Sequence, residues 1–164
     1  MSVVDFLKGT GPDTRGKTLA DVLTQDDAWL EQEHDYIQWL FPLQEESAQV
    51  HDAPVLTSKD MEQLRSSQEA IANQQLATHR MLNFYGFNDH WLVTANHNHL
   101  RITRMLKSVR LLQSLEAAEV IYNTLMEQVR RAGSPIDAKN IAYWSDAVGL
   151  SYSSSSTITT TYEQ

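Results

Sequence analysis

The 164-residue chain contains no cysteine, only six glycines and four prolines, and no hydrophobic run approaching the length of a membrane span. The absence of cysteine excludes disulfides and thiolate metal ligands. The first eight residues, MSVVDFLK, are interrupted by charge too early for a signal peptide. We therefore expect a soluble, cytoplasmic protein, which at this length can bury a core without covalent cross-links.

Positive charge is also scarce, because 13 Lys and Arg stand against 21 Asp and Glu, a formal net charge of -8. A field of this sign repels nucleic acid and acidic membrane surfaces, so either kind of binding needs a local basic patch. We expect neither nucleic acid nor a membrane as a partner.

Strand patterns with hairpin turn residues are missing as well, whereas helical spacing and helix-capping residues recur along the chain. The sequence predicts an all-α fold, a compact bundle of five or six helices with a central helix and no sheet. We expect the helical domain over residues 18–150, after a glycine-containing arm over 1–17 that packs loosely. The serine- and threonine-rich residues 151–164 lack the apolar surface to fold, which predicts a disordered tail.

One predicted helix covers residues 25–41 and ends before Pro42, which lacks an N–H group. At 100° per residue, one side of this helix is apolar and comprises Trp29, Leu30, Tyr36, Ile37 and Leu40. Glu33 falls within that apolar side, while Glu31 and Gln38 fall on the opposite, solvent side. A carboxylate directed at the core needs a partner, because burying an unpaired charge costs several kcal/mol of folding free energy.

A short helical turn opens at Thr18, and a long helix is predicted from Thr57 or Ser58 to Tyr85, with Gly86 as its stop. Its inward stripe also carries three polar residues, Gln68, Gln75 and His79, which favours a groove edge or satisfied buried polar groups. Two further helices are predicted from Ser114 to the glycine at 133, and from Ser134-Pro135 to about 149.

The helix predicted over residues 97–112 is apolar on two sides, so it is the candidate central helix. Its main apolar face, predicted inward, comprises Ile102, Met105, Leu106, Val109 and Leu112, and the second side carries Leu100 and Leu111. The helix carries four cations and no acid: Arg101, Arg104, Lys107 and Arg110. Together with the free N–H groups of its N-terminus, these cations suit a phosphate or carboxylate. The alternative is an internal ion pair in which Arg101 or Arg104 meets Glu33 or another acid between positions 26 and 35.

Catalytic and metal-binding patterns are weak. His97 and His99, with His34 or His90, have no spacing specific for a metal, so we expect no metal or cofactor. The chain has no nucleophile elbow, glycine-rich phosphate loop or dinucleotide fingerprint, and we expect no enzyme. General acid–base chemistry by Glu33 with His79 or His97 is the less favoured alternative.

Four sequence blocks resemble the conserved region of the opioid growth factor receptor family. They are His34-x-Tyr36-Ile37-Gln38-Trp39-Leu40-Phe41-Pro42-Leu43, Ser66-Ser67-Gln68-Glu69, Met81-Leu82-x-Phe84-Tyr85-Gly86, and His97-Asn98-x-Leu100-Arg101-Ile102-Thr103-Arg104-x-Leu106-Lys107-Ser108. The blocks occur in family order. The resemblance implies a relative of receptors for the peptide methionine-enkephalin, which lie around and within the nucleus and restrain proliferation. We expect a stand-alone version of this region without the long charged tail of animal members, and the resemblance supplies no catalytic residues.

We therefore expect a non-enzymatic helical binding module that holds a peptide or protein ligand near the junction of helices 25–41 and 97–112. The expected ligand-binding residues are Trp29, Glu33, Tyr36, His97, Asn98, Arg101 and Arg104. A carboxylate beside two aromatic rings suits a cationic, aromatic ligand. Two alternatives remain: an anion-binding sensor or enzyme that uses Arg101 and Arg104 on phosphate or carboxylate, and a purely structural role in oligomer assembly.

Overall fold

The computed structural model describes residues 2–150, and the predicted tail over 151–164 lies outside them. The described residues form helices and no strand, apart from an isolated bridge between Leu43 and Val55. The helices are α1 (Val3–Lys8), α2 (Leu19–Leu23), α3 (Asp27–Gln32), α4 (Asp35–Leu40), α5 (Ser58–Arg65), α6 (Gln68–Phe87), α7 (Asn98–Leu112), α8 (Leu115–Arg131) and α9 (Ala138–Ala147). The all-α prediction is confirmed. Nine helices stand within 2–150 rather than five or six, because two predicted helices are each divided and α1 is additional.

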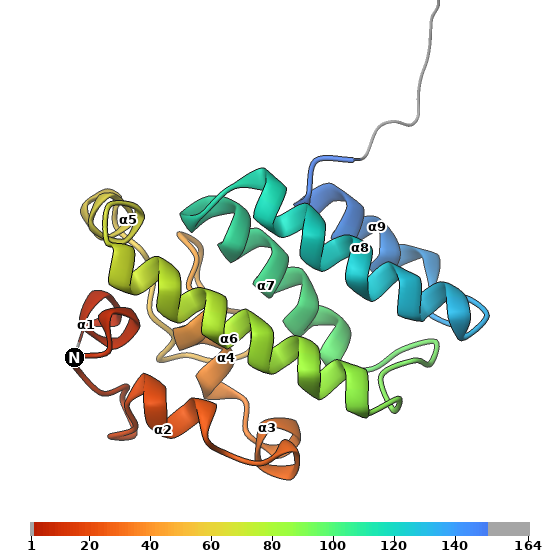
Figure 1. The fold of residues 1–164 in the computed structure, drawn as a ribbon, viewed down its shortest axis with the longest axis horizontal. Helices are drawn as coiled ribbons and strands as arrows, with labels where there is room; N and C mark the ends of the chain where they lie inside the picture. The colour runs from red at the N-terminus through yellow and green to blue at the C-terminus, as the bar shows by residue number, and fades with distance from the viewer. Residues whose placement is uncertain (1, 151–164) are drawn as a thin grey trace, which may run out of the picture.

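Helix α7 is the centre of the fold, as predicted, although Leu100, one of the two apolar residues expected on its second side, is 47% exposed. It packs against α4, α5 and α6 on one side and against α8 and α9 on the other, and Figure 1 shows it between α6 and the α8–α9 pair. Its predicted inward residues are all buried: Ile102, Met105, Leu106, Val109 and Leu112. Helix α8 also follows its prediction, since Ser114 caps it and Ala118, Ile121, Leu125 and Val129 face the core.

The expectation of a loosely packed N-terminal arm is wrong for residues 3–8. Ser2 caps helix α1, and Gly9 ends it in the left-handed conformation at φ 83°. Four α1 side chains are buried against α4, α5 and α6: Val3, Val4, Phe6 and Leu7. Phe6 is fully buried and meets the Trp39 ring edge to face at 5.4 Å. The small number of helical residues concealed this amphipathic pattern.

The single helix predicted over 25–41 is also wrong, because the chain breaks between α3 and α4. Glu33 is extended, with φ -83° and ψ 150°, so its side chain does not continue the α3 stripe. The long helix predicted to end at Tyr85 is divided at Ser66-Ser67, where Ser67 caps α6 by accepting from the Ala70 N–H. Serine favours such a cap over a helix interior.

These breaks change which polar residues are buried. Gln68, Gln75 and His79 are exposed, although the unbroken helix predicted them inward. Gln74 is buried instead, and its Nε2 donates to the Leu40 carbonyl (3.2 Å) and to Ser108 Oγ (3.0 Å). Helix α9 begins later than predicted, because Asp137 rather than Ser134 caps it.

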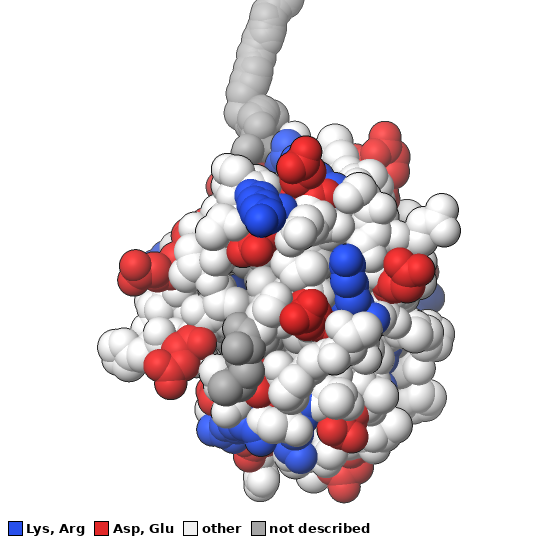
Figure 2. All heavy atoms as spheres, turned by 90° about the vertical axis from the view of Figure 1, so that its left-hand side faces the viewer, with Lys and Arg blue, Asp and Glu red and all other residues white. Residues whose placement is uncertain are grey.

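Charged side chains on the face shown in Figure 2 are mixed in sign, with Lys and Arg lying between Asp and Glu rather than in one continuous patch. Within residues 2–150, none of the helices combines the length and the hydropathy needed to cross a membrane.

Candidate functional site

A groove of about 680 Å³ lies between α4, the first half of α7 and the chain that follows α4. The groove lies at the junction of the segments 25–41 and 97–112, where the sequence predicted a ligand site. Its wall is formed by residues 45–52, and its floor by side chains of α4 and α7. The floor residues used below are Gln38, His97, Arg101, Arg104 and Lys107.

The floor is cationic because of the helical spacing of α7. Arg101, Arg104 and Lys107 follow each other at intervals of three residues, which brings them near one face of the helix. No Asp or Glu occurs in α7 to neutralise them. Each of the three therefore finds its partner on another element, and the partners differ in kind.

Both terminal nitrogens of Arg101 are engaged by the main chain at the end of α3. Nη1 donates to the Leu30 carbonyl (2.8 Å), and Nη2 donates to the carbonyls of Glu31 (3.3 Å) and Glu33. The last carbonyls of a helix have no partner within the helix and carry its negative end charge. Arg101 supplies both the donors and the charge, which explains how the chain can break at Glu33 without leaving buried carbonyls unpaired.

Arg104 is buried to a similar degree, 9% exposed against 7% for Arg101, but it has much less to bind. Its Nε donates to the Phe41 carbonyl at the end of α4 (2.9 Å), whereas its Nη2 has no hydrogen-bond partner. Burial lowers the pKa of Arg104 to about 10, and Glu45 only partly opposes this effect. No carboxylate lies within ion-pair distance among residues 2–150, so Arg104 is a buried cation without a paired acid.

Gln38 presents a second unsatisfied group on the same floor. Its side chain is buried, its Nε2 approaches Ser47 Oγ at 3.4 Å, and its Oε1 has no partner. Arg104 binds the carbonyl of Phe41, which follows Gln38 by about one helical turn. The floor thus offers an unpaired donor and an unpaired acceptor from neighbouring helices.

The wall of the groove is a closed loop, residues 44–55, which we call the covering loop. Its two ends are held together because the Leu56 N–H donates to the Leu43 carbonyl (2.8 Å), and both of these leucines are buried. No residue between them is buried. Such a loop can change position without disturbing the core that anchors its ends.

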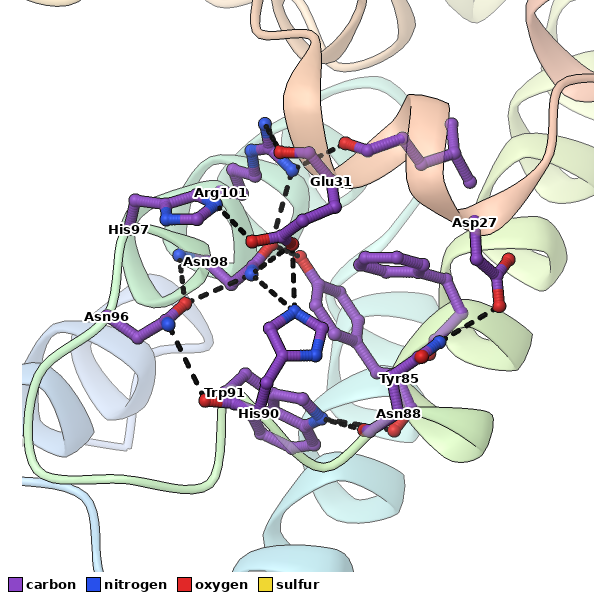
Figure 3. A network of polar contacts seen from close by, with 12 residues as sticks. Asp27, Glu31, Tyr85, Asn88, His90, Trp91, Asn96, His97, Asn98 and Arg101 are labelled. Carbon is purple, nitrogen blue, oxygen red and sulfur yellow. Dashed lines mark hydrogen bonds and ion pairs between the residues drawn. The ribbon is translucent and has the colours of Figure 1, made fainter.

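Behind the groove, a polar network fastens the connector between α6 and α7 to α3 (Figure 3). Glu31 lies at its centre: Oε1 meets His90 Nε2 (2.8 Å) and accepts from Asn98 Nδ2 (3.0 Å), while Oε2 meets His97 Nε2 (3.0 Å). Burial raises the pKa of Glu31, but the hydrogen bonds from Asn98 and His90 and the nearby histidine charges outweigh it, so the pKa is lowered. At His97, burial acts in the opposite direction and is the main cause of a lowered pKa.

The seven expected ligand-binding residues fall into three places. His97, Arg101 and Arg104 line the groove. Tyr36 and Asn98 are buried behind it, where the Tyr36 hydroxyl donates to Leu30 O (2.6 Å) and Asn98 Oδ1 accepts from Tyr85 (3.1 Å). The other two, described next, lie outside the groove.

Trp29 and Glu33 belong to the surface facing residues 13–17. The Glu33 carboxylate pairs with Arg15, and the Trp29 ring packs on Tyr36 at 5.2 Å with Lys17 Nζ 5.7 Å from its centre. The expected pair between Glu33 and Arg101 or Arg104 does not form, because Arg101 takes the Glu33 carbonyl instead of its carboxylate.

Sequence reasoning missed Glu31 and Gln38. A continuous helical projection placed Glu31 towards solvent, although the Asn96-His97-Asn98 cluster contained its partners. Gln38 was placed on the solvent side for the same reason. The only sequence clue to Gln38 was its position inside the first family block, directly before Trp39.

The histidines do not gather into a metal site within the described residues. His99 is buried, with Nε2 bonded to the Trp91 carbonyl (2.7 Å), whereas His90 and His97 meet Glu31. Within residues 2–150, no group of three or more His, Asp or Glu side chains is placed to hold a metal ion. The alternative of an anion site formed by Arg101 and Arg104 is not favoured, because the terminal nitrogens of Arg101 already donate to main-chain carbonyls.

Comparison with known proteins gives a consistent assignment. The family described as the opioid growth factor receptor (OGFr) conserved region matches residues 11–92, half of the chain, which include the first three sequence blocks but not the block at 97–108. The rat opioid growth factor receptor is 41% identical over 98 residues, covering 49% of this chain and 17% of the relative.

Mouse opioid growth factor receptor-like protein 1 is 38% identical over 97 residues, and the human opioid growth factor receptor is 39% identical over 101 residues. The matches cover 49% of this chain but only 21% and 14% of these two relatives, so the chain spans a minor part of their length. No solved structure matches the chain. From the matched half of the sequence, the protein belongs to the opioid growth factor receptor (OGFr) conserved-region family.

Proposed function

We propose that this chain is a non-enzymatic binding module, and that a peptide or a segment of a partner protein occupies the groove between α4, α7 and the covering loop. The observation that carries the proposal is the pair of unsatisfied buried atoms on the groove floor, Arg104 Nη2 and Gln38 Oε1. Buried polar groups are nearly always paired in folded proteins, so two exceptions in one groove need an explanation.

A peptide segment can form a hydrogen bond with each of the two unpaired atoms, Arg104 Nη2 and Gln38 Oε1. Each peptide unit carries a carbonyl that can accept from Arg104 and an N–H that can donate to Gln38. The groove, at about 680 Å³, lies within the usual range of about 300–1,000 Å³ for ligand sites. Both atoms are closed to solvent, and Ser47 of the covering loop lies 3.4 Å from Gln38 Nε2, so we expect a ligand that reaches them to displace part of that loop.

The relatives support the same class of function. They are named receptors for an opioid growth factor, and a receptor role requires a ligand site rather than a catalytic centre. The chain spans about a fifth or less of the length of these relatives. The ligand of the full-length relatives is therefore one candidate ligand for this chain.

The test is an NMR titration of the ¹⁵N-labelled chain with methionine-enkephalin and with short capped peptides of acidic, neutral and basic composition. Binding in the groove shifts the amide signals of residues 44–52 and 97–107. Arg104→Met weakens binding about tenfold or more, whereas Arg130→Met, at an exposed arginine of α8 outside the groove, leaves it unchanged. Binding that is indifferent to Arg104, or signal shifts confined to other faces, would overturn the proposal.

A further inference from the structure

The two sides of the groove carry opposite charge. The floor contributes Arg101, Arg104 and Lys107 from α7, which has no acid. The covering loop contributes three acids and no lysine or arginine, the acids being Glu45, Glu46 and Asp52. Asp35, the remaining acid of the lining, forms an ion pair with Arg15, whose Nε lies 3.1 Å from Asp35 Oδ2. In a chain of net charge -8, this floor is a local concentration of positive charge.

The acids of the covering loop satisfy this floor incompletely. Glu45 forms the only ion pair between loop and floor within residues 2–150, and it binds Lys107 Nζ (3.0 Å) rather than Arg104. Arg104 feels Glu45 only at longer range. A buried guanidinium with an unpaired Nη2 would gain most from a carboxylate placed directly against it, because charge-assisted hydrogen bonds are the strong ones.

The covering loop is weakly held over this floor. Among residues 44–52, side-chain hydrogen bonds to the rest of the fold are limited to Glu45 with Lys107 and Ser47 with Gln38. The first pair is exposed on both sides, and the second is long at 3.4 Å. An exposed ion pair contributes about 0–1 kcal/mol, so a competing ligand loses little by displacing the loop.

We infer that the groove recognises an acidic peptide segment, and that the acidic covering loop occupies the place of that ligand in the free protein. The inference rests on the proposed function and names its ligand class. The ligand sets a carboxylate against Arg104 and Lys107, and a main-chain N–H against Gln38 Oε1. A fully deprotonated inorganic anion such as sulfate offers acceptors alone and leaves Gln38 unsatisfied.

The loop acts as a tethered competitor. A segment joined at both ends to the fold has an effective concentration of about millimolar, which masks a free peptide of modest affinity. Neutralising the acids of the loop therefore strengthens the binding of a free acidic peptide. Loss of negative charge anywhere on the chain also reduces the repulsion of an acidic peptide, so the gain is measured against a variant that loses the same charges elsewhere.

The probe is an acetylated and amidated peptide copy of residues 44–52, QEESAQVHD, labelled for fluorescence anisotropy. Its neutral twin carries Gln and Asn in place of the acids. The test protein carries Glu45→Gln, Glu46→Gln and Asp52→Asn, and a matched control carries the same changes at Glu62, Glu119 and Asp89, which lie outside the groove. Circular dichroism checks that each variant is folded.

We expect the loop variant to bind the acidic probe about tenfold or more tightly than the wild type. The control variant loses the same three negative charges, so any gain it shows measures nonspecific attraction and is subtracted. Adding Arg104→Met to the loop variant abolishes the gain. The neutral twin binds neither protein, and sulfate at equal charge does not compete.

Several results would overturn the inference. Equal gains in the loop and control variants would mean that only net charge matters, and competition by sulfate would mean a site for a single anion. Preference of the folded loop variant for basic peptides or methionine-enkephalin would refute the acidic ligand and leave the peptide groove standing. Failure of peptides of every charge to bind that variant would remove the proposed function as well.

Discussion

Replacing Arg101 by methionine is expected to destabilise the fold much more than the same replacement of Arg104. The two arginines lie on the same helix and are buried to 7% and 9% exposure, so the comparison holds burial and side-chain size constant. They differ in their partners: Arg101 donates to three main-chain carbonyls, whereas Arg104 donates to one and leaves a nitrogen unpaired.

The expected magnitude for Arg101→Met follows from those carbonyls. A hydrogen bond from a charged donor contributes about 1.5–3 kcal/mol when its partner cannot be hydrated. Leu30 O is buried and retains only the Tyr36 hydroxyl, while the carbonyls of Glu31 and Glu33 are partly buried and regain water. Taking about 1.5–2 kcal/mol for the first and about 1 kcal/mol for each of the others gives a loss of about 3.5–4 kcal/mol.

For Arg104→Met, two effects oppose each other. Loss of the bond to the Phe41 carbonyl destabilises the fold, and removal of a buried, unpaired charge relieves a desolvation cost of similar size. The net change is expected to stay within about 1 kcal/mol. Arg101→Lys falls between the two variants, because one ammonium group cannot span separate carbonyls.

The assay is equilibrium unfolding in urea, followed by fluorescence of the four tryptophans, of which Trp39, Trp91 and Trp144 are buried. With a urea dependence of about 2 kcal/mol per molar, Arg101→Met lowers the midpoint by about 1.5–2 M, and Arg104→Met by less than about 0.5 M. Equal midpoint shifts, or a larger one for Arg104, would refute the distinction between an arginine that closes a helix end and one kept for a ligand.

Three further outcomes are expected. Since the folded pKa of Glu31 lies below its ordinary 4.5, its contribution is complete above that pH and is lost as the pH falls through the folded value, so urea curves of Glu31→Gln and wild type converge in acid. Burial lowers the pKa of His97 below 6.5, so the fold loses stability as the pH falls from 6.5 towards the folded value, and His97→Gln flattens that slope in a pH series of midpoints. Phe6→Ala costs about 3–5 kcal/mol because α1 is part of the core; a loss below about 1 kcal/mol would restore the loosely packed arm.

Local pattern predicted the C-terminal half of the fold well. Helices α7 and α8 have long apolar stripes, and long periodic segments are the ones whose type follows from sequence. Ser114 caps α8 as predicted, whereas no side chain caps α7 at His97. The predicted central position of α7 is confirmed, although Leu100 on its second apolar side is exposed. The family blocks came from resemblance, and the comparisons confirmed the family over residues 11–92.

The N-terminal half depended on contacts between distant residues. Sequence placed Glu33 in the core and Glu31 in solvent, on the assumption of one unbroken helix. The break between α3 and α4 is stabilised by Arg101, about 70 positions further along the chain, and nothing in residues 25–41 encodes that partner.

By itself, the sequence determined the fold class, the central helix, the family and the concentration of cations on residues 101–110 without any acid. Only the tertiary structure decided which of these cations is already satisfied. Periodicity fixes the face on which a side chain stands, but hydrogen bonding depends on which carbonyls other segments bring to that face. Arg101 meets the open end of α3 and has both terminal nitrogens bonded, whereas Arg104 meets a single carbonyl and keeps a terminal nitrogen unpaired.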